Sequence, residues 1–158
     1  MTIQMVMTIS TYEFDVRGSR PRPWGIPKDT NEWREFLAER IRKFQVRTIP
    51  KNSLVECQVK IDFFITIKYL FVSDLDNLAK PVIDTIFLPK NPQVKNRQLT
   101  GVVFKDDDAY INVLELRKIC VDSEEDEGVV INILYRLRED RTPKKERTIA
   151  LEDEHANS

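Results

Sequence analysis

The chain has 158 residues, of which 41% are hydrophobic and 32% charged, and its formal net charge is −1 at pH 7. These values indicate one compact domain and exclude collagen-like, low-complexity and wholly disordered chains. No stretch approaches the roughly 20 apolar residues of a membrane-spanning helix, and the first residues lack the basic flank and apolar core of a signal peptide. We therefore expect a cytoplasmic protein.

Several enzyme classes lack their essential residues. The single histidine, His155, lies in a polar segment, which excludes serine and cysteine hydrolases with a catalytic histidine, HExxH proteases and Cys/His zinc sites. Four glycines are too few and too scattered for a P-loop or a dinucleotide fingerprint. Cys57 and Cys120 both lie in apolar-patterned segments, so we expect two buried free thiols and no disulfide. Any chemistry must come from carboxylates and basic side chains, with a hard metal ion that takes oxygen ligands.

The first half of the chain predicts a strand, a loop, a helix and a second strand. Ile3, Met5, Met7 and Ile9 alternate with polar residues, which is typical of a half-buried strand, and a basic loop rich in Gly and Pro follows over 17–30. Apolar spacing predicts a helix over 31–44, with Asp29 and Glu32 as a capping box. Strict alternation predicts a strand over 55–65.

The second half predicts a helix and two further strands. The helix lies within DLDNLAKPVIDTIF, residues 74–87, where Pro81 predicts either a late start near Leu78 or a bend at Lys80–Pro81. A polar loop over 88–100 precedes strands over 111–118 and 129–137, which an acidic turn separates. We expect an α/β (α+β) domain over 1–138, a mixed sheet with two main helices packed on it, followed by a polar, disordered tail over 139–158.

Two groups of acids suggest a metal site. Asp74 and Asp76 would point the same way in an extended segment, and if Asp76 caps the helix, Lys80 and Asp84 follow it along one face. The second group is the triplet Asp106–Asp108. Because clustered carboxylates repel one another, they favour a divalent cation such as Mg²⁺, which binds carboxylates, water and phosphate oxygens.

Each group also has a purely structural interpretation. Asp74 and Asp76 would suit a helix N-terminus, the Lys80–Asp84 spacing suits a surface ion pair, and the triplet suits a solvated turn. A calcium-binding EF-hand loop is excluded, because neither group supplies the required oxygen ligand, Gly and Glu at the fifth, sixth and twelfth positions.

The run DLDNLAKPVIDTIF followed by GVVFKDDDAYI resembles the signature of the RusA-like Holliday-junction resolvases, D-x-D-N-x-x-K-x-x-x-D and then D-D-x-x-[IV]. The resemblance covers residues 74–111 and implies a mixed α/β fold. It implies that Asp74, Asp76 and Asp108 are metal-binding acids, that Asp107 also contributes to the metal site, and that Lys80 is the catalytic lysine. Asn77 and Asp84 match further positions of the pattern, with Asn77 implied to orient the loop. Ile111 favours Asp107–Asp108 as the acidic pair, and Asp106–Asp107 is the alternative register.

The resemblance also implies a homodimer that uses Mg²⁺, or Mn²⁺ in its place, to nick two strands of a four-way DNA junction in recombination and repair. Two departures from the family are the long basic loop before Gly101 and the acidic turn and tail.

The charge distribution can be reconciled with a DNA partner despite the net charge of −1. Residues 17–51 contain ten Lys/Arg against four acids, and residues 80–105 contain five against Asp84 alone. Such basic stretches beside an acidic site suit phosphate binding, although they would also suit an ordinary mixed surface. The candidate DNA-backbone contacts are Arg20, Arg22, Lys90, Lys95 and Arg97.

We therefore predict a Mg²⁺-dependent structure-selective endodeoxyribonuclease in which Asp74, Asp76, Lys80 and Asp108 are catalytic. Two alternatives stay open. One is a non-catalytic DNA-binding or regulatory dimer on the same scaffold, which would need the basic surface but not the acids. The other is a nuclease of relaxed specificity, because junction shape is read through backbone contacts and dimer geometry, which no base-reading motif reveals.

Overall fold

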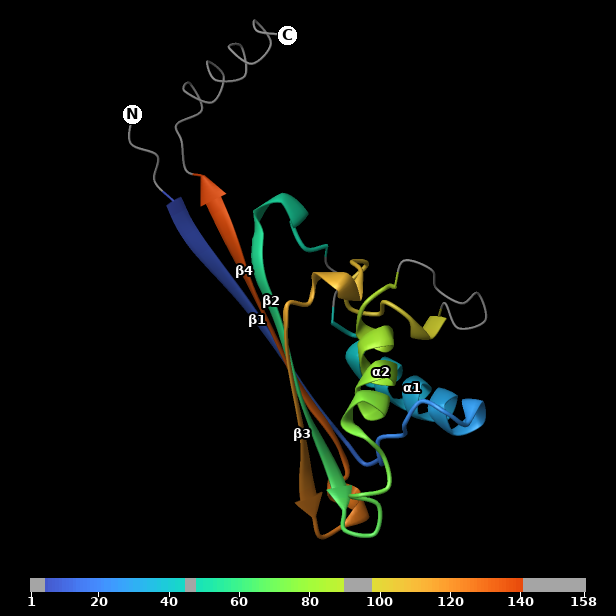
Figure 1. Cartoon of the computed structure of the whole chain (residues 1–158). Helices are drawn as coiled ribbons and strands as arrows, with labels where there is room; N and C mark the ends of the chain where they lie inside the picture. The colour runs from blue at the N-terminus through green and yellow to red at the C-terminus, as the bar shows by residue number, and fades with distance from the viewer. Residues whose placement is uncertain (1–4, 45–47, 90–97, 141–158) are drawn as a thin grey trace, which may run out of the picture.

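The computed structural model describes residues 5–44, 48–89 and 98–140. Four strands form one sheet: β1 (Met5–Arg17), β2 (Leu54–Thr66), β3 (Val113–Val121) and β4 (Gly128–Asp140). Their order is β1-β4-β2-β3, with β2 and β3 parallel and the other neighbours antiparallel. The helices α1 (Pro27–Ile41) and α2 (Leu75–Ile86) lie on the same side of this sheet (Figure 1). The predicted α+β class and mixed sheet are confirmed.

The described residues also form short 3₁₀ turns, among them η1 (Lys51–Ser53), η3 (Asp108–Tyr110) and η4 (Glu124–Asp126). The acidic turn between β3 and β4 contains η4, as the sequence suggested. The two strands that flank this turn both end later in the chain than predicted, at Val121 and Asp140. β4 continues to Asp140, and most of the expected tail lies outside the described residues.

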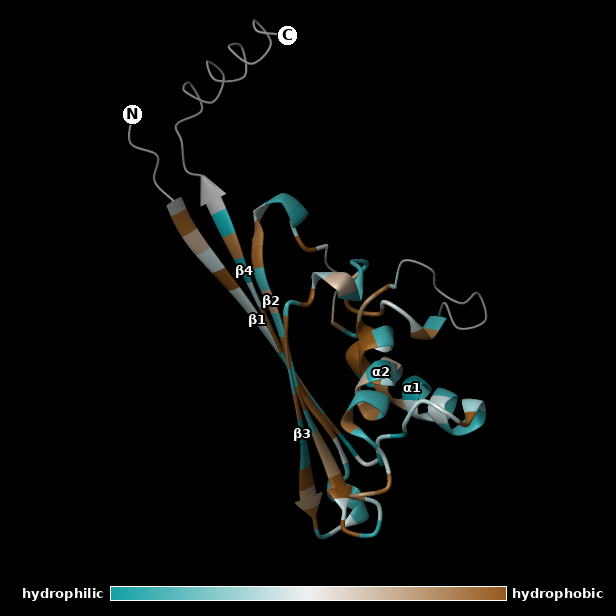
Figure 2. Ribbon diagram, in the orientation of Figure 1, coloured by the Kyte–Doolittle hydropathy of each residue, from teal (hydrophilic) through white to brown (hydrophobic). Residues whose placement is uncertain are grey.

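The core lies between the sheet and the two helices. Along β2 the alternating residues Cys57, Val59, Ile61, Phe63 and Ile65 are almost fully buried, which confirms the clearest strand prediction. Helix α2 turns its apolar residues toward them (Figure 2). Burial of this apolar surface is the main stabilising contribution to the fold.

The predicted orientation of β1 is wrong. Met7 and Ile9 are 49% and 52% exposed, whereas Phe14 and Val16, on the alternate face, are buried. The reason is that the start of β1 pairs with the end of β4 beyond the part of the sheet that the helices cover (Figure 1). Near the other end of this pair, a Cβ at Gly128 would collide with the backbone oxygen of Val16, so only glycine fits there.

The first helix begins earlier than predicted. Pro27 occupies its first turn and the N-cap position is Ile26, which makes no side-chain capping bond, so the predicted capping box of Asp29 and Glu32 is wrong. Proline explains the earlier start, because its fixed φ and missing N–H suit the first helical turn. Ile41 ends the helix, three residues before the predicted end at residue 44.

Helix α2 contains Pro81 in its interior and still begins at Leu75, so the predicted late start near Leu78 is wrong. Proline cannot donate to the carbonyl oxygen four residues earlier, which belongs to Asn77. That oxygen instead accepts a hydrogen bond from the backbone N–H of Trp24, at 2.9 Å. The Asn77 carbonyl oxygen, which has no donor within the helix, thereby binds the loop between β1 and α1 to α2.

The two thiols are free and differ in environment. Cys57 is buried on β2, whereas Cys120 on β3 is exposed, so the expectation of two buried thiols holds for Cys57 only. β3 is an edge strand paired on one side, and this explains the lower burial of its residues. In the described part of the chain, no helix is long and apolar enough to cross a membrane.

Candidate functional site

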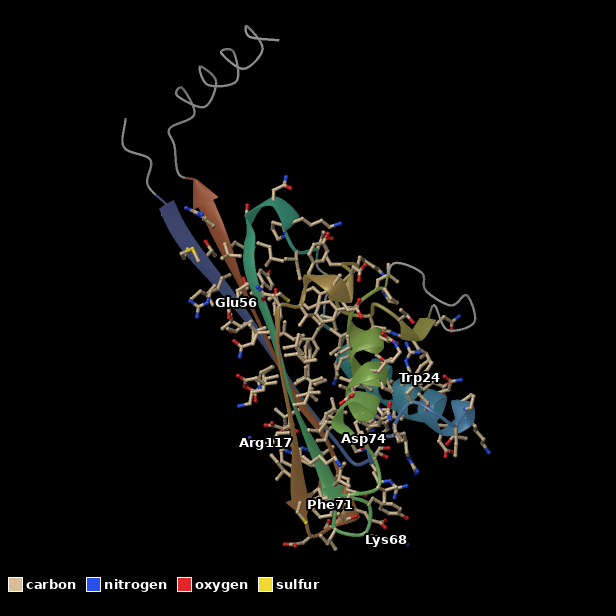
Figure 3. All side chains as sticks on the ribbon, viewed as in Figure 1. Trp24, Glu56, Lys68, Phe71, Asp74 and Arg117 are labelled. Carbon is tan, nitrogen blue, oxygen red and sulfur yellow. The ribbon has the colours of Figure 1, made fainter. Side chains whose placement is uncertain are left out.

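The predicted acids lie at two places along α2. Asp74 is the N-cap residue, has extended backbone angles and makes no side-chain capping bond, while Asp76 lies in the first helical turn. The expectation that Asp76 caps the helix is therefore wrong. The two acids do not share an extended segment either, because the helix begins between them at Leu75. Figure 3 shows Asp74 where the chain enters α2.

The three consecutive aspartates have different roles in the structure. Asp106 is only 2% exposed, and its Oδ2 accepts a hydrogen bond from the backbone N–H of Ile49 at 2.7 Å. Asp107 caps η3 by accepting from the N–H of Ala109 at 2.9 Å. Asp108 is the first residue of that turn and is half-buried. Because Asp106 is committed to the backbone, Asp107 and Asp108 are the acids available for chemistry.

Asp108 belongs to a cluster with Asp107, Asp84 and Lys80. A hydrogen bond with Asp107, partial burial, and the charges of Asp107 and Asp84 together raise the pKa of Asp108 from 3.8 to about 6, and Lys80 opposes this rise. Lys80 Nζ lies 3.5 Å from Asp84 Oδ2, one helical turn along α2, so the predicted common face of these two residues is confirmed. Carboxylates that raise one another's pKa in this way favour a cation beside them, because their negative charges repel.

The structure does not bring all the predicted metal ligands together. Asp76 and Asp84 are separated by about 12 Å of helical rise, so Asp74 and Asp76 begin the helix while Asp107 and Asp108 lie beside its later turns. Among the described residues, no three His, Cys, Asp or Glu side chains are arranged so that they could hold a metal ion. The role of Asp74 and Asp76 as ligands stays a prediction.

A buried arginine holds in place the helix that carries two members of the cluster. Arg34 of α1 donates from Nε to Thr85 Oγ1 of α2 at 3.0 Å and from its terminal nitrogen to the Leu99 carbonyl oxygen at 2.7 Å and to Thr100 Oγ1 at 2.9 Å. Burial lowers the pKa of Arg34, and the charge of Asp84 opposes that shift. These bonds fix the helix that carries Lys80 and Asp84 against α1. The sequence alone did not distinguish Arg34 from the other basic residues of 17–51.

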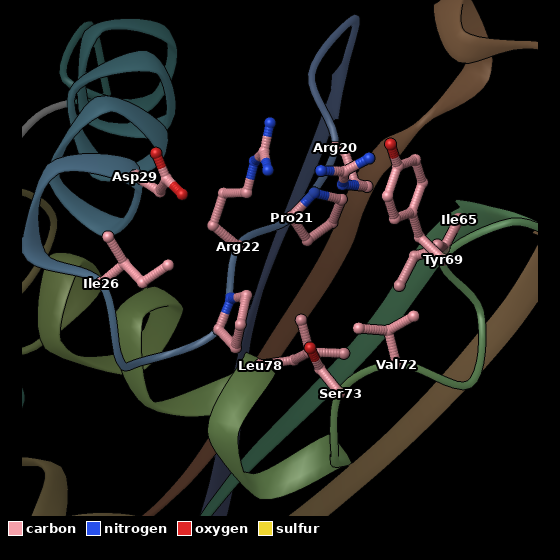
Figure 4. A pocket seen from close by; sticks show the side chains of 11 residues that line it. Arg20, Pro21, Arg22, Ile26, Asp29, Ile65, Tyr69, Val72, Ser73 and Leu78 are labelled. Atoms are coloured by element: carbon pink, nitrogen blue, oxygen red, sulfur yellow. The ribbon is translucent and has the colours of Figure 1, made fainter.

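Two of the predicted DNA contacts line a pocket near Asp74. Arg20 and Arg22 border a cavity of about 200 Å³ that Tyr69, Val72 and Ser73 close on the other side (Figure 4). The Arg20 guanidinium lies 3.2 Å from the centre of the Tyr69 ring. Hydrogen bonds from Arg20 and Lys68 lower the pKa of Tyr69. Lys90, Lys95 and Arg97 lie outside the described residues.

Sequence reasoning missed the apolar residues beside this pocket. Phe71 and Val72 are 83% and 71% exposed, three and two residues before Asp74. The sequence signal for these residues is the run YLFVS, residues 69–73, which is as hydrophobic as the strand before it. The chain has already left the sheet there, because β2 ends at Thr66. Large apolar residues directly before Asp74 and Asp76 could have indicated a surface that contacts a partner molecule.

Comparisons of the chain with protein-family profiles, with curated proteins and with solved structures found no match.

Proposed function

We propose that this chain is a Mg²⁺-dependent endodeoxyribonuclease that cuts branched DNA, four-way junctions in particular, as a homodimer in the cytoplasm. One observation carries the proposal: Asp107 and Asp108 pair closely beside Asp84 and Lys80, so that the pKa of Asp108 is raised to about 6. Acids whose charges repel at neutral pH are stabilised by a cation, and a lysine at the same place can meet the phosphate that accompanies it.

Asp107 and Asp108 would hold such an ion together with water and phosphate oxygens, because Mg²⁺ needs only one or two carboxylates from the protein. Asp74 and Asp76 stay the further predicted ligands at the start of the same helix. When bound, Mg²⁺ neutralises the charge of a phosphodiester and lowers the pKa of a coordinated water, which makes that water a nucleophile. Lys80, whose side chain is 55% exposed, can reach a phosphate oxygen and stabilise the negative charge that develops there. Arg20 and Arg22 would contact neighbouring phosphates of the same strand.

Cleavage of a labelled synthetic four-way junction tests the proposal, with matched linear duplex and single strand as comparison substrates. We expect paired nicks in the junction with Mg²⁺ and none with EDTA. Asp108→Asn and Asp74→Asn should abolish cleavage and retain or tighten junction binding, because removal of a negative charge eases the approach of phosphate. Asp122→Asn, on an exposed acid in the β3–β4 turn, is the matched control. Cleavage that survives EDTA, or full activity of Asp108→Asn, would refute the site.

A non-catalytic DNA-binding protein is the second candidate. It is favoured by the absence, among the described residues, of three acids arranged for a metal. Such a protein would still bind the junction but would leave the strands uncut with Mg²⁺ and with Mn²⁺.

A further inference from the structure

The loop between β2 and α2, residues 67–73, presents large apolar side chains to solvent. Ile67, Phe71 and Val72 are 68%, 83% and 71% exposed, and Phe71 is the most exposed of the large hydrophobic residues described. Figure 3 shows Phe71 and Lys68 at the end of the molecule where β2 ends, with Asp74 closer to α2. Exposed apolar residues that gather in one place mark an interaction surface more often than isolated ones do.

This loop is anchored at its start and in its middle. At its start, Glu127, itself 3% exposed, accepts hydrogen bonds from the backbone N–H and the hydroxyl of Thr66, both at 3.1 Å. Leu70 is buried within the loop, and the N–H of Val72 donates to the Tyr69 carbonyl oxygen at 3.2 Å. Phe71 therefore projects from a fixed base, which reduces the entropy lost when it binds.

The basic side chains around Tyr69, two residues before Phe71, favour a polyanion as the partner. Arg20 lies over the Tyr69 ring at 3.2 Å and Lys68 Nζ lies 5.2 Å from the centre of the same ring. The adjoining cavity is lined by Arg20 and Arg22 against one acid, Asp29. An apolar surface between two copies of the chain would bring these like charges together. A nucleic acid strand instead offers base faces to the apolar residues and phosphates to the basic ones.

Phe71 lies close along the chain to Asp74, the first of the predicted acids. Two residues lie between Phe71 and Asp74, so their Cα atoms lie within about 11 Å of each other. Because the repeat of a stacked strand is about 3.4 Å, this span covers up to about three nucleotides. A base held at Phe71 would thus belong to the same stretch of strand as a phosphate near Asp74.

We propose that Phe71 and Val72 stack on an unpaired or unstacked nucleobase at a DNA branch point, with Arg20 and Arg22 binding the phosphates beside it. This inference rests on the proposed action on branched DNA and assigns to this loop the preference for a branch over a continuous duplex. In an intact duplex every base is stacked on its neighbours, so Phe71 would have to separate them at a cost in free energy. At a branch point that stacking is already interrupted.

The test compares Phe71→Ala, the conservative Phe71→Trp and the control Ile9→Ala, which removes an exposed apolar side chain from β1. Binding is measured in EDTA, so that no strand is cut, to a four-way junction and to a duplex of the same sequence. A fluorescent base analogue is placed either at the branch point or within one arm. Circular dichroism verifies that each variant is folded.

We expect Phe71→Ala to lose about tenfold or more in junction affinity while its duplex affinity stays within about twofold of the parent. The fluorescence change at the branch point should disappear in Phe71→Ala and persist in Phe71→Trp and Ile9→Ala. Equal junction affinity and an unchanged fluorescence response in Phe71→Ala would overturn the inference while leaving the proposed nuclease intact. A parent that dimerises through this loop, with Phe71→Ala monomeric and unaltered in DNA binding, would also overturn it. A parent that binds no DNA would refute the proposed function itself.

Discussion

The Asp106 carboxylate and the backbone N–H of Ile49 form a buried hydrogen bond of 2.7 Å, which ties the segment before η1 to the segment before η3. Both residues are almost fully buried, so neither partner can exchange this bond for one with water. The first aspartate of the triplet is thereby structural, whereas the third lies in the candidate site.

Asp106→Ala should therefore destabilise the fold, because it leaves the buried N–H of Ile49 without its acceptor. We expect a loss of about 1–3 kcal/mol in the free energy of unfolding, measured by urea denaturation. Asp108→Asn in the same experiment should retain or exceed the stability of the parent. An Asp106→Ala variant as stable as the parent would show that this bond does not stabilise the folded state.

The raised pKa of Asp108 predicts a pH dependence of stability in the metal-free protein. The carboxyl group has an ordinary pKa of 3.8 and a folded-state pKa of about 6, so the folded state binds more protons between these values. Stability should fall as pH rises through this interval, because the charged carboxylate is disfavoured next to Asp107 and Asp84.

Thermal unfolding in EDTA from pH 4 to pH 7 measures this effect. Asp108→Asn should show a smaller decrease than the parent over the same range, and Asp122→Asn should behave as the parent does. Added Mg²⁺ should oppose the decrease if the cluster binds the ion. A parent and an Asp108→Asn variant with the same pH profile would contradict the coupling between these acids.

Lys80 provides a prediction about activity. Lys80→Gln should reduce the rate of junction cleavage by about a hundredfold, while junction affinity stays within about threefold, because the lysine is proposed to stabilise charge that develops during the reaction. The control Lys28→Gln removes an exposed cation from the first turn of α1. Single-turnover kinetics separate the two effects, and an equal loss of binding and cleavage would assign Lys80 to phosphate binding alone.

Arg34 should be required for stability more than for chemistry. Arg34→Leu removes the donor that connects α1 with Thr85 and with the Leu99 carbonyl oxygen, and we expect a loss of about 2–4 kcal/mol. Arg34→Lys cannot reproduce the forked geometry and should recover only part of this loss. Lys43→Leu, an exposed cation just beyond α1, should change the free energy of unfolding by less than about 0.5 kcal/mol.

The two thiols should differ in reactivity. Burial, with the charge of Asp106 as a second cause, raises the pKa of Cys57 to about 11, and its side chain is fully buried, whereas Cys120 is exposed. A thiol reagent at pH 8 should therefore modify one cysteine in the folded protein and both in denaturant. Cys120→Ser should abolish the labelling of the folded chain. Rapid modification of Cys57 would show that this part of the core opens readily.

Local patterns predicted much of the fold. The alternation of β2, the apolar spacing of both helices and the strands on either side of the acidic turn depend on interactions between near neighbours in the sequence, so composition and period reveal them. The same patterns failed at β1 and at the start of α1. At β1, burial of Met7 depends on how far the helices extend over the sheet, which the sequence of the strand does not record. At α1, Pro27 starts the helix before the predicted capping motif.

The candidate site shows the same division. The sequence by itself determined the acids, the lysine that follows them and the spacing that places Lys80 beside Asp84, because helical geometry sets this contact. Only the tertiary structure decided which aspartate of the triplet is buried, which helix turn Asp108 approaches, that Arg34 is a buried connection and that Phe71 is exposed. Each of these depends on segments far apart in the chain, whose approach is decided by packing of the whole core and leaves no local periodicity to detect.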